Sequence, residues 1–236
     1  MSAEISAQVA KLREKIVESC DTFGAEVVTL IQQENIELLQ WIKYLTESQR
    51  TGIADNLING LLCSIREAAA CAALGLIRPA LFAMRSQVDL TLAWLYFKDH
   101  SVEWNTVNER GESFKLKKEI LEYLNSNFPG FSARLTLLTE VKLRTTADPY
   151  KLLSAHVHAQ SELVLPRTED LADVVHEKKL SIEGVGIAKE TCEYISDILM
   201  CFYVANWDAI PSAITQGIEK RLNTKNNHMK RFFEGA

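Results

Sequence analysis

Apolar residues recur at three- and four-residue spacing along nearly the whole chain. The first such run contains Ile5, Val9, Leu12, Ile16, Cys20 and Phe23, and a second continues to Leu45. This spacing puts the apolar side chains on one face of an α-helix. We expect bends at Gly24 and in the polar stretch 32–35. Because no segment shows the alternation of a β-strand, the pattern predicts an all-α fold.

Capping and breaking residues divide the rest of the chain into further helices. We expect these helices at 55–73, 77–100, 115–124, 132–141, 150–160, 187–204 and 211–222, with a short turn at 101–104. Gly75 should end the first of them, and Asp148 followed by Pro149 should start the helix at 150. The polar segment 161–186 contains Pro166, Gly184 and Gly186, so we predict a connection there with one short helix at 168–177.

The length of 236 residues allows one well-buried core. We therefore predict a single-domain helical bundle of about seven to nine helices. Its core would span residues 53–206, with N-terminal helices at 3–47 and a basic C-terminal segment at 211–236.

Composition narrows the class of protein. The net charge of −5 argues against general coating of nucleic acid. There is no run of ~18 apolar residues and no apolar leader at the start, which favours a cytoplasmic protein with no membrane contact. The five cysteines form no CxxC pair, and glycine-rich phosphate loops are absent. We expect reduced cysteines, no bound metal and no cofactor.

A stripe of charge interrupts the apolar helix expected at 77–100. Arg78, Arg85 and Asp89 lie along one side of it, among Leu, Phe, Met, Val and Trp residues. Charge buried in such a setting is costly unless it is paired. One interpretation is structural, with an Arg85–Asp89 ion pair and Arg78 reaching the helix end. The other is an arginine-lined groove for a phosphate, a carboxylate or an acidic side chain of a partner.

The helix expected at 150–160 carries a second polar set, which comprises Tyr150, Ser154, His156 and His158. Two histidines at i and i+2 of a helix point to nearly opposite sides, so they cannot chelate one metal ion together. One of them should face the core near Tyr150 or Ser154. The other could act as an acid–base group, since imidazole titrates near neutral pH.

The basic C-terminal segment holds a third candidate pair, Arg221 and His228, separated by six residues. Such a pair could position an RNA phosphate and transfer a proton. The alternative is an ordinary solvated helix end, because Lys220, Lys225, Lys230 and Arg231 are close by.

Two of these segments together resemble a group of bacterial HEPN-like helical proteins. One is the run from Arg85 to Asp89 with the aromatic residues that follow it, and the other is the run from Tyr150 to His158. The resemblance covers mainly residues 60–160. It implies a helical bundle from a toxin–antitoxin, abortive-infection or antiviral defence system.

Many HEPN-like proteins are metal-independent RNases that use an arginine and a later histidine with four to six residues between them, usually across a dimer. This chain departs from that pattern, because residues 149–154 before His156 and His158 include no arginine. The pair Arg221 and His228 matches the spacing, but Leu222 stands where a polar residue is usual.

The leading hypothesis is therefore an interaction or ligand-binding subunit of a bacterial antiviral defence or toxin–antitoxin system. It would bind a protein partner or self-associate through apolar helices within 5–45, and it could contact RNA through the basic C-terminal segment. The first alternative is a metal-independent RNase that uses His158 or His228 with Arg85 or Arg221. The second is a helical scaffold in which the charged stripe only sets the helix register.

Overall fold

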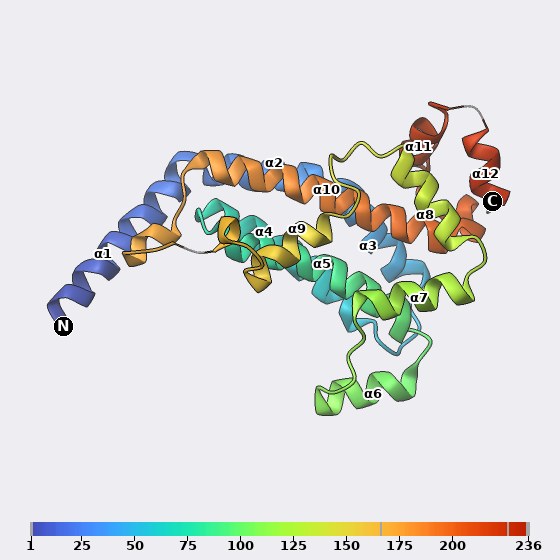
Figure 1. Ribbon diagram of the computed structural model, residues 1–236, viewed down its shortest axis with the longest axis horizontal. Helices are drawn as coiled ribbons and strands as arrows, with labels where there is room; N and C mark the ends of the chain where they lie inside the picture. Colours follow the sequence, from blue (N-terminus) through green and yellow to red (C-terminus); the bar gives the residue numbers. More distant parts are fainter. Residues whose placement is uncertain (1, 166, 226, 235–236) are drawn as a thin grey trace. The chain divides into compact units, whose positions relative to one another are not determined.

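A computed structural model describes residues 2–165, 167–225 and 227–234, and all of the regular secondary structure in these ranges is helical (Figure 1). These ranges contain no β-strand, so the all-α prediction is confirmed. Helices α1 to α12 outnumber the seven to nine expected. A HEPN-like core stays a prediction.

The chain forms two compact units, each assembled from three segments. The first unit comprises Met1–Ile36, Cys63–Gln87 and Asp148–Thr191, and the second comprises Glu37–Leu62, Val88–Ala147 and Cys192–Ala236. Three of the five boundaries between them fall inside α4 (Asn56–Ala73), α5 (Ile77–Phe97) and α10 (Lys178–Tyr203). The single-domain organisation stays a prediction.

The first unit begins with one long helical run that changes direction at a π-helical turn. This run comprises α1 (Ser2–Ser19), the π-helix Cys20–Gly24 and α2 (Ala25–Glu34). Figure 1 shows the change in direction between α1 and α2, at the bend expected near Gly24. A π-turn bends a helix because it inserts an extra residue into the hydrogen-bond ladder. The run ends at Asn35, as the polar stretch 32–35 predicted.

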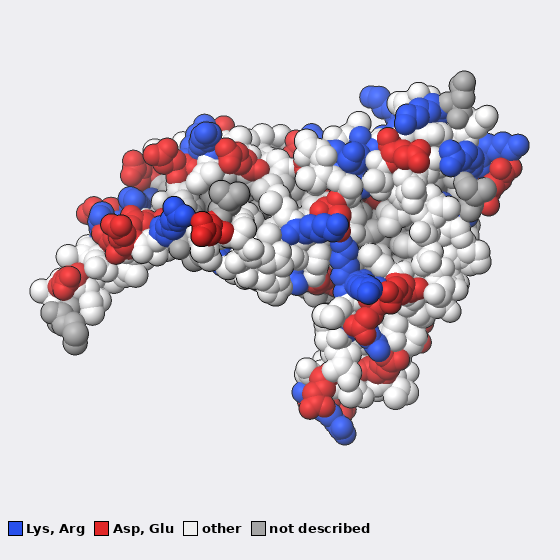
Figure 2. Space-filling view, viewed as in Figure 1, with Lys and Arg blue, Asp and Glu red and all other residues white. Residues whose placement is uncertain are grey.

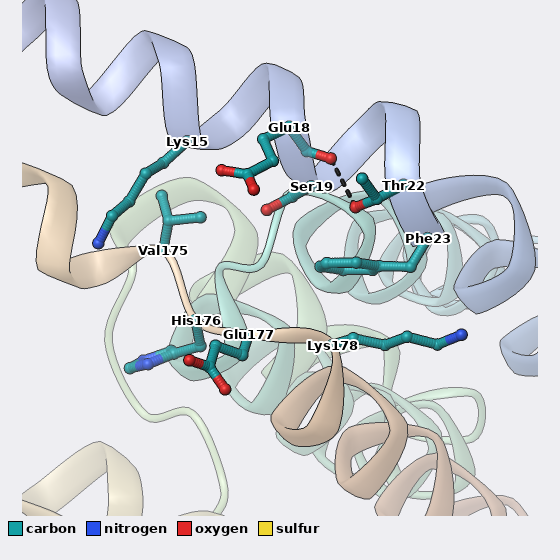
Figure 3. Close-up of a pocket in the computed structure, with 9 residues that line it drawn as sticks. All are labelled: Lys15, Glu18, Ser19, Thr22, Phe23, Val175, His176, Glu177 and Lys178. Carbon is teal, nitrogen blue, oxygen red and sulfur yellow. Dashed lines mark hydrogen bonds between the residues drawn. The ribbon is translucent and has the colours of Figure 1, made fainter.

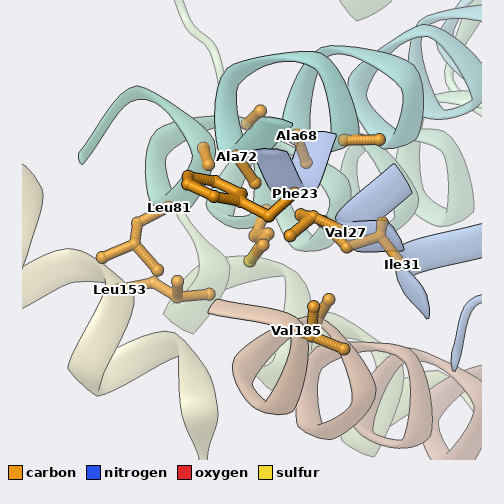
Figure 4. Packing of buried hydrophobic residues seen from close by; sticks show 13 residues of the cluster. Phe23, Val27, Ile31, Ala68, Ala72, Leu81, Leu153 and Val185 are labelled. Atoms are coloured by element: carbon orange, nitrogen blue, oxygen red, sulfur yellow. The ribbon is translucent and has the colours of Figure 1, made fainter. Parts of the chain in front are cut away.

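The core of the first unit joins this long run to α4, α5, α9 (Pro149–His158) and α10 (Figure 4). Alanines of α4 and α5 allow these helices to approach closely, while larger side chains fill the space between them. The labelled members include Phe23, Val27, Ile31, Leu81, Leu153 and Val185. Burial of each large apolar side chain stabilises the unit by roughly 1.5–3 kcal/mol. Leu153 anchors α9 in this core.

The prediction of a connection at 161–186 is wrong from Lys178 onward, because α10 begins at that residue. Gly184 and Gly186 lie inside that helix. Val185 is buried in the core, and the Ser181 hydroxyl donates to the Ala72 carbonyl at 3.0 Å. Tertiary packing outweighs the low helix propensity of glycine here. The helix expected at 168–177 is shortened to a 3-10 turn at Leu171–Val174, and Glu162–Val164 forms another.

The second unit contains α3 (Ile36–Ser48), α6 (Ser101–Arg110), α7 (Lys117–Asn127), α8 (Phe131–Glu140), the 3-10 helix Val204–Ala209, α11 (Ser212–Leu222) and α12 (His228–Glu234). The segment expected to be a short turn at 101–104 is a full helix. The sequence pattern also missed α12, a short helix held by the fully buried Phe232. Figure 2 shows Lys and Arg side chains gathered over α11 and α12, with some acidic groups among them.

No single helix in the described part of the chain is long and apolar enough to cross a membrane. The segments Leu171–Ala209 and Ser212–Leu222 reach that length and apolarity only as a sharply bent pair.

Candidate functional site

The first unit brings the arginines of α5 together with polar side chains of α9. Arg85 donates from Nε to the Ser154 hydroxyl at 3.2 Å and from Nη2 to the Tyr150 hydroxyl at 2.8 Å. Its guanidinium carbon lies 5.0 Å from the centre of the Tyr150 ring, which adds a cation–π contact. We name the set Arg78, Arg85, Tyr150, Ser154 and His156 the α5–α9 polar cluster.

Local sequence positions the α9 half of this cluster. The Asp148 carboxylate caps the helix by accepting a hydrogen bond from the Tyr150 amide at 3.2 Å, and Pro149 occupies the first turn. Tyr150 and Ser154 are four residues apart, so both reach the same face of α9. Leu153 is fully buried on the core side. These contacts fix the orientation of α9 about its axis, so that the Tyr150 and Ser154 hydroxyls face Arg85.

Arg78 lies at the other end of α9. Its Nη2 donates to the His156 carbonyl at 3.0 Å, and its guanidinium carbon is 5.4 Å from the centre of the Phe82 ring. The buried Nε has no hydrogen-bond partner among the described residues. A cation near the last carbonyls of a helix also interacts favourably with the helix dipole. Arg78 therefore caps α9, close to the helix-end role that the structural interpretation gave it.

The two histidines of α9 differ in their surroundings. His156 is half-buried, and its burial, together with the nearby Arg78 charge, lowers its pKa below the ordinary value. His156 is therefore a neutral imidazole near neutral pH. His158 is exposed on the last turn of the helix. Asp89, the third member of the expected stripe, is half-buried and belongs to the second unit.

The second unit contains a buried charge network that the sequence pattern did not reveal. Arg144 Nη1 lies 2.6 Å from Asp197 Oδ2 and 3.0 Å from Glu193 Oε1. Arg221 Nη1 lies 2.9 Å from the same Glu193 oxygen, and Arg221 Nη2 pairs with Asp197 Oδ1. The side chains of Arg144 and Asp197 are completely buried. We name these four residues the buried charge network. The signal that could have found it is Glu193 and Asp197 at i and i+4 within an apolar helix.

Arg221, one half of the expected catalytic pair, thus points both of its terminal nitrogens at the carboxylates of Glu193 and Asp197. His228 is also buried, and its Nδ1 has no hydrogen-bond partner among the described residues. The structure places Arg221 as a counter-ion in the interior of the second unit. A catalytic role for His158, His228 or Arg221 stays a prediction.

Glu37 of α3 lies at the edge of this network. Trp41 Nε1 donates to the Ser196 hydroxyl at 2.8 Å, and that hydroxyl donates to the Glu37 carboxylate. Burial raises the pKa of Glu37. The Ser196 hydrogen bond and Arg221 act in the opposite direction, while Asp197 and Glu193 add to the rise. Taken together, these effects raise the pKa of Glu37 above its ordinary value.

We expect the free energy of unfolding of Glu37→Gln, relative to that of the wild type, to increase as the pH rises. The folded-state pKa of Glu37 lies above its unfolded value, so the wild-type side chain contributes stability at acidic pH and loses it as the pH rises through the folded-state value. Glutamine keeps the shape and cannot ionise. Urea unfolding between mildly acidic and mildly alkaline pH measures the effect. Glu47→Gln, which changes an exposed acid in the same helix, is the control. If the difference in free energy of unfolding between the wild type and Glu37→Gln does not change with pH, the raised pKa of Glu37 is contradicted.

Among the described residues, no group of three or more His, Cys, Asp or Glu side chains is arranged to hold a metal ion. Comparison of this chain with family models, with curated proteins and with solved structures gives no match.

Proposed function

We propose that this protein is a helical binding subunit that recognises an acidic group of a protein partner through the α5–α9 polar cluster. The observation that carries the proposal is the Arg78 guanidinium. It lies beside the exposed Phe82 ring and forms no ion pair with any described residue. A bacterial antiviral defence or toxin–antitoxin system, which the resemblance implies, is the proposed biological setting.

Charge and apolar surface occur together at this place. Phe82 is 36% exposed, and it lies on α5 between the half-buried Arg78 and Arg85. The ring and hydroxyl contacts of Arg85 hold its guanidinium in one orientation, so a partner would lose less entropy on pairing with it. Arginines and aromatic rings are the residue types that most often dominate the binding energy of protein interfaces. The cluster therefore supports a small anchor site for a partner that carries both an acidic and an apolar side chain.

The proposal is tested with a partner isolated from cells that express the full chain, then purified and titrated calorimetrically. We expect Arg78→Gln and Phe82→Ser each to weaken that complex by about tenfold or more, which corresponds to about 1.4 kcal/mol. Leu143→Ser removes a more exposed apolar side chain, at 75%, from a loop of the second unit, and it should leave affinity unchanged. Circular dichroism verifies that each variant is folded.

Two outcomes would contradict the proposal. A partner that binds all three variants equally would leave the cluster with a structural role, as in the scaffold hypothesis. Cleavage of RNA by the purified chain in EDTA, abolished by His158→Ala or His228→Ala, would instead assign the metal-independent RNase.

A further inference from the structure

The 3-10 turn Leu171–Val174 packs against α1 within the first unit (Figure 1). We name residues 170–174 the strap. Asp170, at the start of the strap, forms an ion pair at 2.7 Å with Lys11 of α1. The α5–α9 polar cluster includes no residue of α1 or of the strap. An inference about this contact therefore goes beyond the proposed function and does not rest on it.

The charges that hold the strap on α1 are open to solvent. The side chains of Lys11 and Asp170 are 55% and 26% exposed. Lys15, one turn further along α1, attracts the carboxylate of Asp173. Figure 3 shows Lys15 on the side of α1 that faces Val175, directly after the strap. Salt screens exposed pairs of this kind, and each shifts an equilibrium by about fivefold at most.

The apolar contact between the strap and α1 is small. Within residues 170–174, all of which the structure describes, Ala172 alone is fully buried, while Leu171 and Val174 are 44% and 38% exposed. Directly after the strap, a hollow of about 430 Å³ separates α1 and the π-helical turn from Val175–Lys178 (Figure 3). A single buried methyl group contributes much less than the large side chains of the core. The exposed ion pairs therefore supply a large share of the attachment.

The strap keeps its shape through hydrogen bonds of its own. The Asp170 carboxylate accepts from the Ala172 amide at 3.3 Å. The Asp173 carboxylate accepts from the amides of Glu169 and Asp170 at 3.0 Å and 2.9 Å. These contacts do not involve α1, so they persist when the strap leaves it. Opening breaks only the contacts with α1, which makes it a local event rather than unfolding of the unit.

The chain is fixed immediately after the strap. The His176 amide donates to the Gly75 carbonyl at 2.9 Å, and Val175 is buried. A Cβ added at Gly75 would lie 2.8 Å from both Val175 Cγ1 and the His176 carbonyl oxygen, so the two segments are in close contact. A strap that leaves α1 therefore pivots at these residues.

The strap covers part of a longer apolar face on α1. Leu12 and Ile16, which directly follow the two lysines, are half-buried. Val9 and Ile5 continue the same face toward the start of the helix, and they are 51% and 53% exposed. The spacing of four, three and four residues places all four side chains in one stripe. Removal of the strap would make this stripe continuous at the surface.

We propose that the strap is a salt-sensitive latch, which opens as a preformed turn about Val175 and His176 and uncovers the apolar face of α1. The closed latch limits the accessible face to Ile5 and Val9. The open latch adds Leu12. Ionic strength, or any charged molecule that competes for the lysines of α1, thereby regulates how much of this face is available for contact.

The test is thiol labelling of the full chain that carries Ala172→Cys, with mass spectrometry to identify the labelled residue, because Cys20 and Cys63 are also exposed. The labelling rate reports the population of the open latch. We expect it to be about three- to tenfold faster in about 1 M NaCl than in about 0.01 M NaCl. Lys11→Gln combined with Lys15→Gln should give fast labelling at both concentrations.

Two controls separate latch opening from general loosening of the first unit. Ala188→Cys lies fully buried on α10, and it should be labelled at least about tenfold more slowly, without acceleration by salt. Lys189→Gln removes another exposed ion pair of this unit, with Glu34 at 3.0 Å, and should leave the labelling of Ala172→Cys unchanged. In the wild type, hydrogen exchange of peptides from 1–19 should also increase with salt, whereas peptides from 187–203 should not change.

Three results would overturn the proposal. Labelling of Ala172→Cys as slow as that of Ala188→Cys would show that the strap leaves α1 only when the unit unfolds. Labelling and wild-type exchange that do not respond to salt would show that the ion pairs do not hold the strap. An unchanged salt response after both lysines are replaced would assign that response to another contact.

Discussion

Asp197→Asn should lower the free energy of unfolding by about 3 to 5 kcal/mol. The Asp197 carboxylate is fully buried and pairs with both Arg144 and Arg221. Asparagine has nearly the same volume, so packing is preserved while the negative charge is lost. Two arginines then remain in the interior with Glu193 as their remaining partner in the network. A buried charge left without compensation is far more costly than the pair is stabilising. Equilibrium urea unfolding at neutral pH measures the loss.

Two variants separate this explanation from general damage to α10. Glu183→Gln changes an exposed acid in the same helix and should alter stability by less than about 0.5 kcal/mol. Asp197→Asn combined with Arg221→Met removes one charge of each sign, so it should cost less than the sum of the two single substitutions. Strict additivity would show that the two side chains do not interact in the folded protein.

Gly75→Ala should have the second-largest effect, a loss of about 2 to 4 kcal/mol. Gly75 adopts a left-handed φ of +75° just after α4. An added Cβ would lie 2.8 Å from the His176 carbonyl oxygen and 2.8 Å from Val175 Cγ1. The backbone there is held by a hydrogen bond from the His176 amide to the Gly75 carbonyl at 2.9 Å. The methyl group therefore adds a steric clash to the conformational strain.

Gly52→Ala is the matched control for that prediction. Gly52 has a similar φ of +79°, and an added Cβ would meet nothing within 4 Å. Its substitution should cost only the strain of the left-handed conformation, about 1 kcal/mol. Urea unfolding of both variants gives the difference that the clash contributes. Equal losses would show that residues 175 and 176 move away easily, and that the close approach to Gly75 is not required.

The α5–α9 polar cluster was partly visible in the sequence. Helical spacing placed Arg78 and Arg85 on one side of their helix, and Asp148 with Pro149 marked where the next helix should begin. The structure places Arg85 against Tyr150 and Ser154. The proximity could not be derived from spacing alone, because contacts between helices about 70 residues apart depend on how both pack into one core. The beginning of α10 at Lys178 was hidden for the same reason, since buried Val185 and the Ser181 hydrogen bond hold glycines in a helix.

By itself the sequence determined that the chain is helical, where most helices begin and end, and which side chains share a helical face. These properties depend on residues at most four positions apart, within reach of local periodicity and capping. Only the tertiary structure decided that Arg221 pairs with carboxylates of α10 and that Gly75 meets His176. Those partners are distant along the chain, and burial determines whether a charge or hydroxyl must find a partner at all.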